Sequence, residues 1–139
     1  MTQTLEQVME RVMDPATPVV WVAPGTTESV WTGLRPALEG QGYRVYEIGS
    51  APDYEALMRS IAVAVPMPEW TRPDLNALKD SLLSLEDGGP RGWAMIFRHP
   101  EPLRQHDESA FEDLLEVLEL VHDIRHERHG QMFKLILPD

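Results

Sequence analysis

Short apolar runs alternate with segments of helical periodicity along the chain, and this alternation restricts the possible folds more than any other sequence feature. Residues 19–23 and 93–97 are continuous apolar runs, as expected for strands buried on both faces of a parallel sheet. Residues 43–48 and a run that begins near Met132 and includes residues 133–137 are two further expected strands. Helical segments between strands predict an α/β layer structure with a small, mainly parallel sheet of three to four strands.

Five segments place apolar residues at the spacing of an amphipathic helix. The fourth of them should begin at Asp74, because its carboxylate can accept hydrogen bonds from the free amides of the first turn. The fifth should end at Gly130, since glycine is the usual residue just after a helix. The five expected helices are residues 4–13, a segment carrying Val30, Trp31, Leu34 and Leu38, a segment carrying Leu57, Met58 and Ile61, residues 75–85, and residues 107–129.

The chain is strongly acidic, with 23 Asp plus Glu against 12 Lys plus Arg and a formal net charge of -11. Nucleic acid and anionic membrane surfaces both attract clustered cations, so we expect neither as a partner. A basic protein partner is favoured, because opposite electrostatic fields speed the encounter of two proteins. The simpler interpretation is that the acidity only keeps the protein in solution.

At 139 residues the chain is expected to form a single domain that is monomeric when free. It contains no cysteine, which excludes disulfides and thiolate catalysis. The first 17 residues lack the basic and apolar regions of a secretory signal, and no apolar run approaches the roughly 18 residues of a membrane span. These features predict a cytoplasmic protein that is no enzyme and needs no cofactor or metal.

The most specific local pattern is a proline-containing loop that continues into the fourth helix. Residues 67–82 are Met-Pro-Glu-Trp-Thr-Arg-Pro-Asp-Leu-Asn-Ala-Leu-Lys-Asp-Ser-Leu. Asn76 and Asp80 are four residues apart and therefore share one helix face, away from the leucines. Trp70 is either an interface anchor, because aromatic side chains supply large contact area, or a core tryptophan, and the sequence leaves both open.

This pattern resembles the barstar family, the intracellular protein inhibitors of secreted bacterial ribonucleases. The family has a Pro-Glu-aromatic loop followed by a helix start that reads Asn-Leu-Asp-Ala-Leu-x-Asp-x-Leu, and residues 68–82 follow this pattern closely. The apolar strand after the Gly-Gly-Pro turn and the long helix before the last strand also fit. The resemblance covers residues 43–139, so residues 1–42 are expected to form an N-terminal extension made of an extra helix and a βα unit.

The resemblance implies a mechanism of inhibition. The fourth helix and its preceding loop would cross the active-site cleft of a basic ribonuclease or toxin nuclease, as in an immunity protein. Carboxylates would take the place of the RNA phosphate, with Asp80 as the main inhibitory aspartate and Trp70 packed against the nuclease. The implied partner-binding residues are Trp70, Thr71, Asp74, Asn76, Lys79 and Asp80, together with Glu119 and Asp123 of the long helix.

The chain departs from the family pattern at Asn76 and Lys79 in the helix and at Arg72-Pro73 in the loop. Asn76 is neutral where the family often has an aspartate, and Lys79 replaces a tryptophan of the best-known member. A lysine next to Asp80 weakens the local negative potential unless its ammonium group turns aside. Arg72-Pro73 stiffens the loop at a position that is otherwise small or flexible. A different target, or a non-inhibitory interaction domain of the same fold, therefore stays open.

Other functions have weaker support in the sequence. His122, His126 and His129 could place two ligands for a metal on one helix face, but cationic residues also favour the last turns of a helix for electrostatic reasons. Residues 23–27 are similar to a phosphate-binding βα turn without its glycine pattern or lysine, which leaves a small nucleotide-binding enzyme as a minor alternative. Self-association through Trp31 or Trp93 is a third possibility.

Overall fold

The computed structural model describes residues 2–65, 74–85 and 90–139. Within these residues, four strands form one sheet in the order β1-β4-β3-β2, and every neighbouring pair is parallel. The expectation of a small parallel sheet in an α/β layer structure is thus confirmed. The strands are β1 (Val19–Val22), β2 (Tyr43–Ile48), β3 (Gly92–Phe97) and β4 (Met132–Pro138). The helices are α1 (Leu5–Val12), α2 (Glu28–Gly40), α3 (Tyr54–Ala64), α4 (Leu75–Leu83), α5 (Glu101–His106) and α6 (Glu108–His129).

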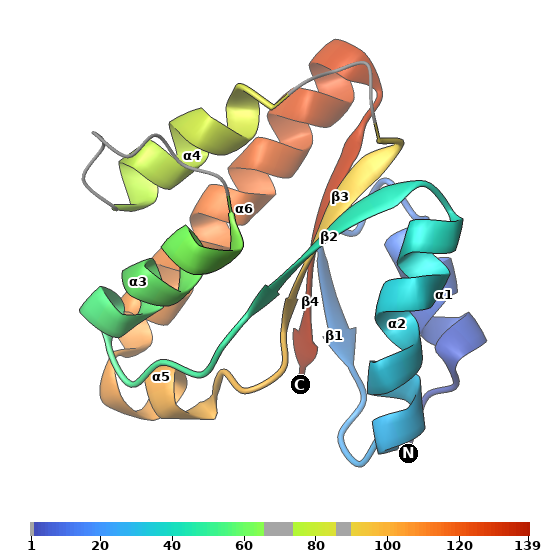
Figure 1. The fold of residues 1–139 in the computed structure, drawn as a ribbon, viewed down its shortest axis with the longest axis horizontal. Helices are drawn as coiled ribbons and strands as arrows, with labels where there is room; N and C mark the ends of the chain where they lie inside the picture. The colour runs from blue at the N-terminus through green and yellow to red at the C-terminus, as the bar shows by residue number, and fades with distance from the viewer. Residues whose placement is uncertain (1, 66–73, 86–89) are drawn as a thin grey trace.

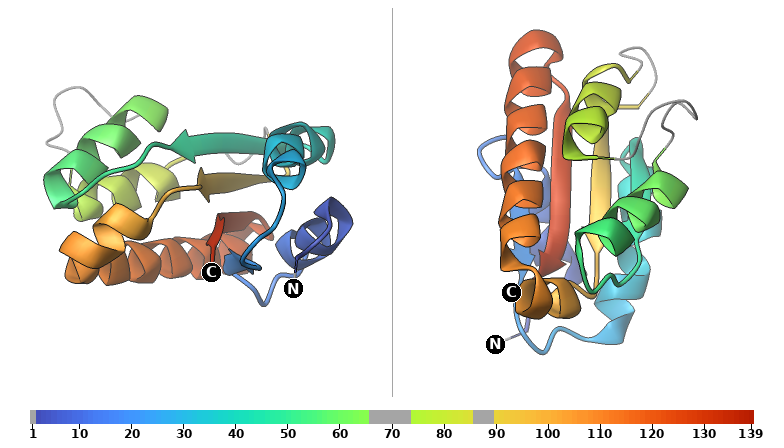
Figure 2. Two further views of the ribbon diagram at one scale, coloured as in Figure 1. Left: turned by 90° about the horizontal axis from the view of Figure 1, so that it is seen from below. Right: turned by 90° about the vertical axis from the view of Figure 1, so that its left-hand side faces the viewer.

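Helices cover both faces of the sheet (Figures 1 and 2). Helices α1 and α2 lie on one face, and α3 to α6 lie on the other. The central strand β3 shows the division, because Trp93, Met95 and Phe97 join the core beneath α3 to α6, whereas Ala94 and Ile96 join the core beneath α1 and α2. Burial on both faces explains why the sequence of β3 is apolar without alternation.

The N-terminal unit, residues 1–42, extends the sheet and covers its second face. Its strand β1 pairs with β4, so the last strand of the chain is not at the edge of the sheet. Helices α1 and α2 bury a separate apolar cluster against the sheet. The cluster comprises Val8, Val12, Val20, Val22, Val30, Leu34, Leu38, Tyr43, Val45, Ala94, Ile96 and Ile136.

A buried lysine fastens the connection between α1 and β1 to the last strand. Lys134 is fully buried, and its ammonium group donates to the backbone carbonyls of Asp14 and, at 2.6 Å, of Thr17. Burial is the main cause that lowers its pKa to about 8, and the nearby Asp14 carboxylate acts in the opposite direction. Two segments far apart in the sequence are therefore joined at a buried site.

His122 of α6 holds the same connection from a second side. Its Nε2 lies 2.8 Å from the Pro15 carbonyl, and its Nδ1 accepts from the Phe133 amide at 3.1 Å. Because a carbonyl oxygen can only accept, Nε2 carries a proton and donates to Pro15, and Nδ1 also lies 3.0 Å from the Phe133 carbonyl. Burial lowers the pKa of His122, and the nearby Lys134 cation lowers it further.

The depressed pKa of Lys134 predicts that stability rises with pH in mildly alkaline solution. Between about pH 8 and pH 10.5 this lysine keeps its proton in the unfolded chain but has lost it in the folded protein. The free energy of unfolding should therefore increase with pH, by at most about 1.4 kcal/mol per pH unit. Burial raises the pKa of Tyr43 and Tyr46 above the ordinary 10.0, so stability should fall again at higher pH. Urea unfolding at pH 7.5, 9 and 10 measures the rise, and Lys134→Met should abolish it. A rise of equal size in Lys134→Met would contradict this assignment.

Apart from shifts of one residue at the ends of α1 and α6, the helices differ from the expected ones in two ways. The sequence predicted one helix over residues 107–129, and the structure adds the short helix α5 before it, with Pro102 in its first turn. Proline suits the start of a helix, but six residues are too few to show a periodic pattern. Helix α4 ends at Leu83 rather than at residue 85, because Ser84 leaves the helical conformation.

The two tryptophans considered for self-association differ in burial. Trp93 is fully buried under α3 to α6, so self-association through this side chain is wrong. Trp31 is half-buried, with the Arg98 guanidinium 5.5 Å from its ring centre. No helix in the described part of the chain is both long and apolar enough to cross a membrane.

Candidate docking surface on helix α4

Helix α4 forms where a cap and an apolar stripe coincide. The Asp74 carboxylate accepts from the Ala77 amide at 2.7 Å, so the predicted cap is confirmed. Leu78 and Leu82 are fully buried and fix the inward face of the helix on the core beneath α3 to α6. Because these leucines point into the core, the opposite face of α4 points outward.

Asn76 and Asp80 are both exposed on this outward face. They belong to successive turns of α4, as the spacing of four residues predicts. Among the described residues, none of the ion pairs involves Asp80. Lys79, beside it in the sequence, is half-buried. The carboxylate of Asp80 is thus presented to solvent and is available to a partner.

Neither the N-terminal unit nor a buried arginine covers Asp80. The N-terminal unit packs on the opposite face of the sheet from α4 (Figure 2). The buried arginine nearest to this helix, Arg125, donates to the backbone carbonyls of Leu82 and Leu83 at its C-terminal end. The extension therefore adds a layer to the fold and leaves the surface of α4 open.

A hollow of about 520 Å³ lies beside the first turn of α4, between α3 and α6. Its acidic lining from α6 comes from Asp113 and Glu116, neither of which is among the partner-binding residues that the resemblance implies. Glu119 and Asp123 are exposed on α6 but do not line this hollow, and their role in partner binding stays a prediction. The lining residues are Tyr54, Asp74, Leu75, Asn76, Asp113, Glu116 and Val117.

The remaining predicted contacts, Trp70 and Thr71, lie outside the described residues. Asp74 is half-buried, and one of its oxygens is engaged in the cap of α4. The structure places Asn76, Lys79 and Asp80 on α4 with Asp74 as its N-cap, and two α6 carboxylates line the hollow beside its first turn.

His122 of α6 is not available as one of the metal ligands that the histidine spacing suggested. His122 directs both ring nitrogens at backbone groups of Pro15 and Phe133, so neither nitrogen faces a metal. His126 stacks on it, with ring centres 5.9 Å apart. The spacing of these residues reflects one structural histidine and one exposed neighbour on the same helix face.

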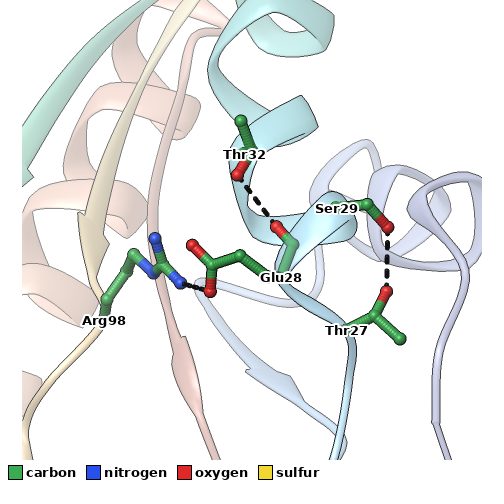
Figure 3. A network of polar contacts seen from close by, with 5 residues as sticks. All are labelled: Thr27, Glu28, Ser29, Thr32 and Arg98. Atoms are coloured by element: carbon green, nitrogen blue, oxygen red, sulfur yellow. Dashed lines mark hydrogen bonds and ion pairs between the residues drawn. The ribbon is translucent and has the colours of Figure 1, made fainter.

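The turn from β1 to α2 differs from a phosphate-binding turn. The start of α2, where a phosphate would bind, already carries a carboxylate. Glu28, in the first turn of α2, pairs with Arg98 at 2.5 Å, and this ion pair lowers the pKa of Glu28 (Figure 3). The hydroxyls of Thr27 and Ser29 lie 3.0 Å apart and are directed at each other (Figure 3). A negative side chain already balances the helix dipole here, which disfavours nucleotide binding at this turn.

Most of the chain matches a known protein family. Residues 43–137 match the family described as barstar (barnase inhibitor). The matched region begins at β2 and includes every element of the layer α3 to α6, whereas α1, β1 and α2 lie outside it. The comparison with curated proteins gives no match. Because the match covers well over half of the sequence, the chain belongs to the barstar family of barnase inhibitors.

Proposed function

We propose that this protein inhibits a basic ribonuclease by docking the exposed face of α4 into the active-site cleft of the enzyme. The observation that carries the proposal is the solvent-exposed carboxylate of Asp80 on a capped helix, in a chain of the barstar family. In this role Asp80 takes the place of an RNA phosphate against the cationic groups of the nuclease. The protein would act in the cytoplasm, as a monomer before it binds.

The negative charge of the protein supports the proposal both at long range and at direct contact. At long range, the net charge of -11 attracts a basic protein and raises the rate of encounter. At contact, a carboxylate that meets arginine or lysine in a closed interface forms short, charge-assisted hydrogen bonds. Asp113 and Glu116 beside the first turn of α4 extend the negative surface toward α6.

A second candidate is an interaction domain that keeps the fold without inhibiting a nuclease. The observation in its favour is the chemistry around Asp80, since Asn76 supplies no charge to the exposed face and Lys79 places a cation one residue away. Such a surface would suit a partner that offers a single cation and a hydrogen-bond donor. Inhibition assays distinguish this candidate from the first, because both predict binding through α4.

The proposed inhibition predicts that the protein blocks RNA cleavage and associates more slowly as salt increases. Barnase, the enzyme in the family's description, is the first probe. Equimolar protein should abolish cleavage of a fluorescent RNA substrate, and the association rate should fall at least tenfold between 50 and 500 mM NaCl, because salt screens charges more than about 10 Å apart. Full cleavage in excess protein, for barnase and for nucleases of the native cell, would reject inhibition and favour the second candidate.

A further inference from the structure

Helix α4 has only 9 residues, too few to be stable without tertiary contacts. Its N-terminal end is fixed from α3, because the Leu75 amide donates to the Tyr54 hydroxyl at 3.3 Å. The cap by Asp74 satisfies a second amide of the first turn. The buried leucines determine which face of α4 is exposed, and the contacts at the C-terminal end fix the direction of the helix axis.

Arg125 of α6 holds that C-terminal end. Its Nη1 donates to the carbonyls of Leu82 at 3.0 Å and Leu83 at 3.2 Å, and its Nη2 donates to the carbonyl of Leu85 at 3.1 Å. The side chain crosses from one helix to the end of another and is 1% exposed. One guanidinium group thus donates hydrogen bonds to the last two carbonyls of α4 and to one carbonyl just after it.

Among the described residues, the donor that these carbonyls meet comes from another element. The last four carbonyls of a helix have no partner within it, and the Ser84 amide bonds only those of Asp80 and Ser81. Helix α4 has no basic residue in its last turn, and serine rather than glycine occupies its C-cap. The Arg125 cation satisfies the remaining carbonyls and also balances the negative end of the helix dipole.

Arg125 is itself held in place by the rest of the core. Gln131 accepts from its Nη2 at 2.7 Å, and its guanidinium carbon lies 4.2 Å from the ring centre of Trp93. Gln131 follows Gly130, whose left-handed conformation (φ 67°) ends α6 and directs the chain into β4. The guanidinium group of Arg125 is therefore held by residues of β3 and of the turn after α6, in addition to its contacts with α4.

We propose that Arg125 is the positioning residue of the docking helix, and that it sets the presentation of Asp80 by fastening the C-terminal end of α4 to α6. Asp80 lies between the two fixed ends, at Asp74 and at Leu82. Among the contacts of the described residues, loss of the Arg125 fork leaves α4 held by its N-terminal hydrogen bonds and by its buried leucines. The consequence for binding depends on the proposed function, whereas the consequence for α4 does not.

The free protein tests the structural half of the proposal. Arg125→Lys keeps the cation but cannot offer a planar fork to three carbonyls, and Arg125→Met keeps the apolar stem without the charge. In both variants we expect amide hydrogen exchange in residues 78–84 to become at least tenfold faster, with β3 and β4 amides unchanged. Arg128→Met, in the exposed last turn of the same helix, is the control and should match the wild type. Unchanged exchange in α4, or equal acceleration across the sheet in Arg125→Lys, would overturn the proposal.

Binding to barnase tests the functional half. Arg125→Lys should raise the dissociation rate about tenfold, comparable to a weakened charged contact, although Arg125 does not reach the partner. In the double variant with Asp80→Ala the two effects should be less than additive, because Arg125 acts through the position of Asp80. Full additivity would show that Arg125 acts on stability alone. If the wild-type protein does not bind any ribonuclease, the proposed function fails, and the exchange experiment still decides whether Arg125 positions α4.

Discussion

Replacing Asp80 by alanine should weaken binding to the ribonuclease more than any other single substitution on α4. The carboxylate is exposed in the free protein, so its removal leaves no buried partner unsatisfied and the fold should keep its stability. In the complex, the same change leaves cationic groups of the nuclease desolvated and unpaired. Such a truncation costs about 2–5 kcal/mol, a range that comes in part from the barnase–barstar complex itself. Surface plasmon resonance or a ribonuclease titration measures the loss.

A matched control for Asp80→Ala is Glu10→Ala, which removes one exposed carboxylate from α1 on the opposite face of the sheet. It lowers the net negative charge by the same amount, so it reports the general electrostatic contribution alone. We expect a change in affinity below about threefold, mostly in the association rate. If Asp80→Ala and Glu10→Ala bound equally well, the assignment of α4 as the docking surface would be wrong.

Removing residues 1–42 should abolish cooperative folding, although the family match begins only at residue 43. The deletion uncovers one whole face of the sheet, including side chains that are at most 6% exposed in the full chain. Each fully buried Val or Ile contributes about 1.5–3 kcal/mol, and typical domains are stable by only about 5–15 kcal/mol. The uncovered residues are Tyr43, Val45, Ala94, Ile96 and Ile136. Circular dichroism with thermal melting measures the outcome.

A single substitution in the same layer, Leu34→Ala, allows the stabilisation by the N-terminal unit to be measured in a folded protein. Leu34 of α2 is fully buried over the sheet, and Leu34→Ala should lower the free energy of unfolding by about 2–5 kcal/mol while it leaves α4 and its exposed face intact. Affinity for the ribonuclease should then be unchanged at temperatures where the variant is folded. A cooperatively folded chain of residues 43–139 with the stability of the full protein would contradict the structural role of the N-terminal unit.

The layers of this fold could be predicted from the sequence because each strand is a local apolar run bounded by turns. The cap at Asp74 and the exposure of Asn76 and Asp80 also follow from local pattern, since the leucine stripe determines the opposite face of α4. Helix α5 could not be predicted, because one and a half turns around a proline carry no periodic signal. Local sequence pattern therefore predicts helix α4 of the candidate site, but not the elements that pack around it.

Contacts between distant segments explain what the sequence did not show. Arg125 falls near the basic end of α6, where a cation is expected for the helix dipole alone, and its partners on α4 are about 40 residues away. Lys134 lies inside an apolar strand, and its carbonyl partners are 120 and 117 residues away. Asp113 and Glu116 face α4 only because of how the two helices pack. The helical position of Arg125, in line with Leu114, Leu118 and Val121, was the available signal for its burial.

The most direct test of the central claim is competition at the ribonuclease active site. A mononucleotide that occupies the catalytic cleft of barnase should compete with this protein, so that the apparent dissociation constant rises in proportion to the nucleotide concentration above its own Kd. Isothermal titration with increasing nucleotide gives this dependence. If the affinity stays the same when the cleft is saturated with nucleotide, the protein binds elsewhere, and the account of Asp80 as a substitute for an RNA phosphate is contradicted.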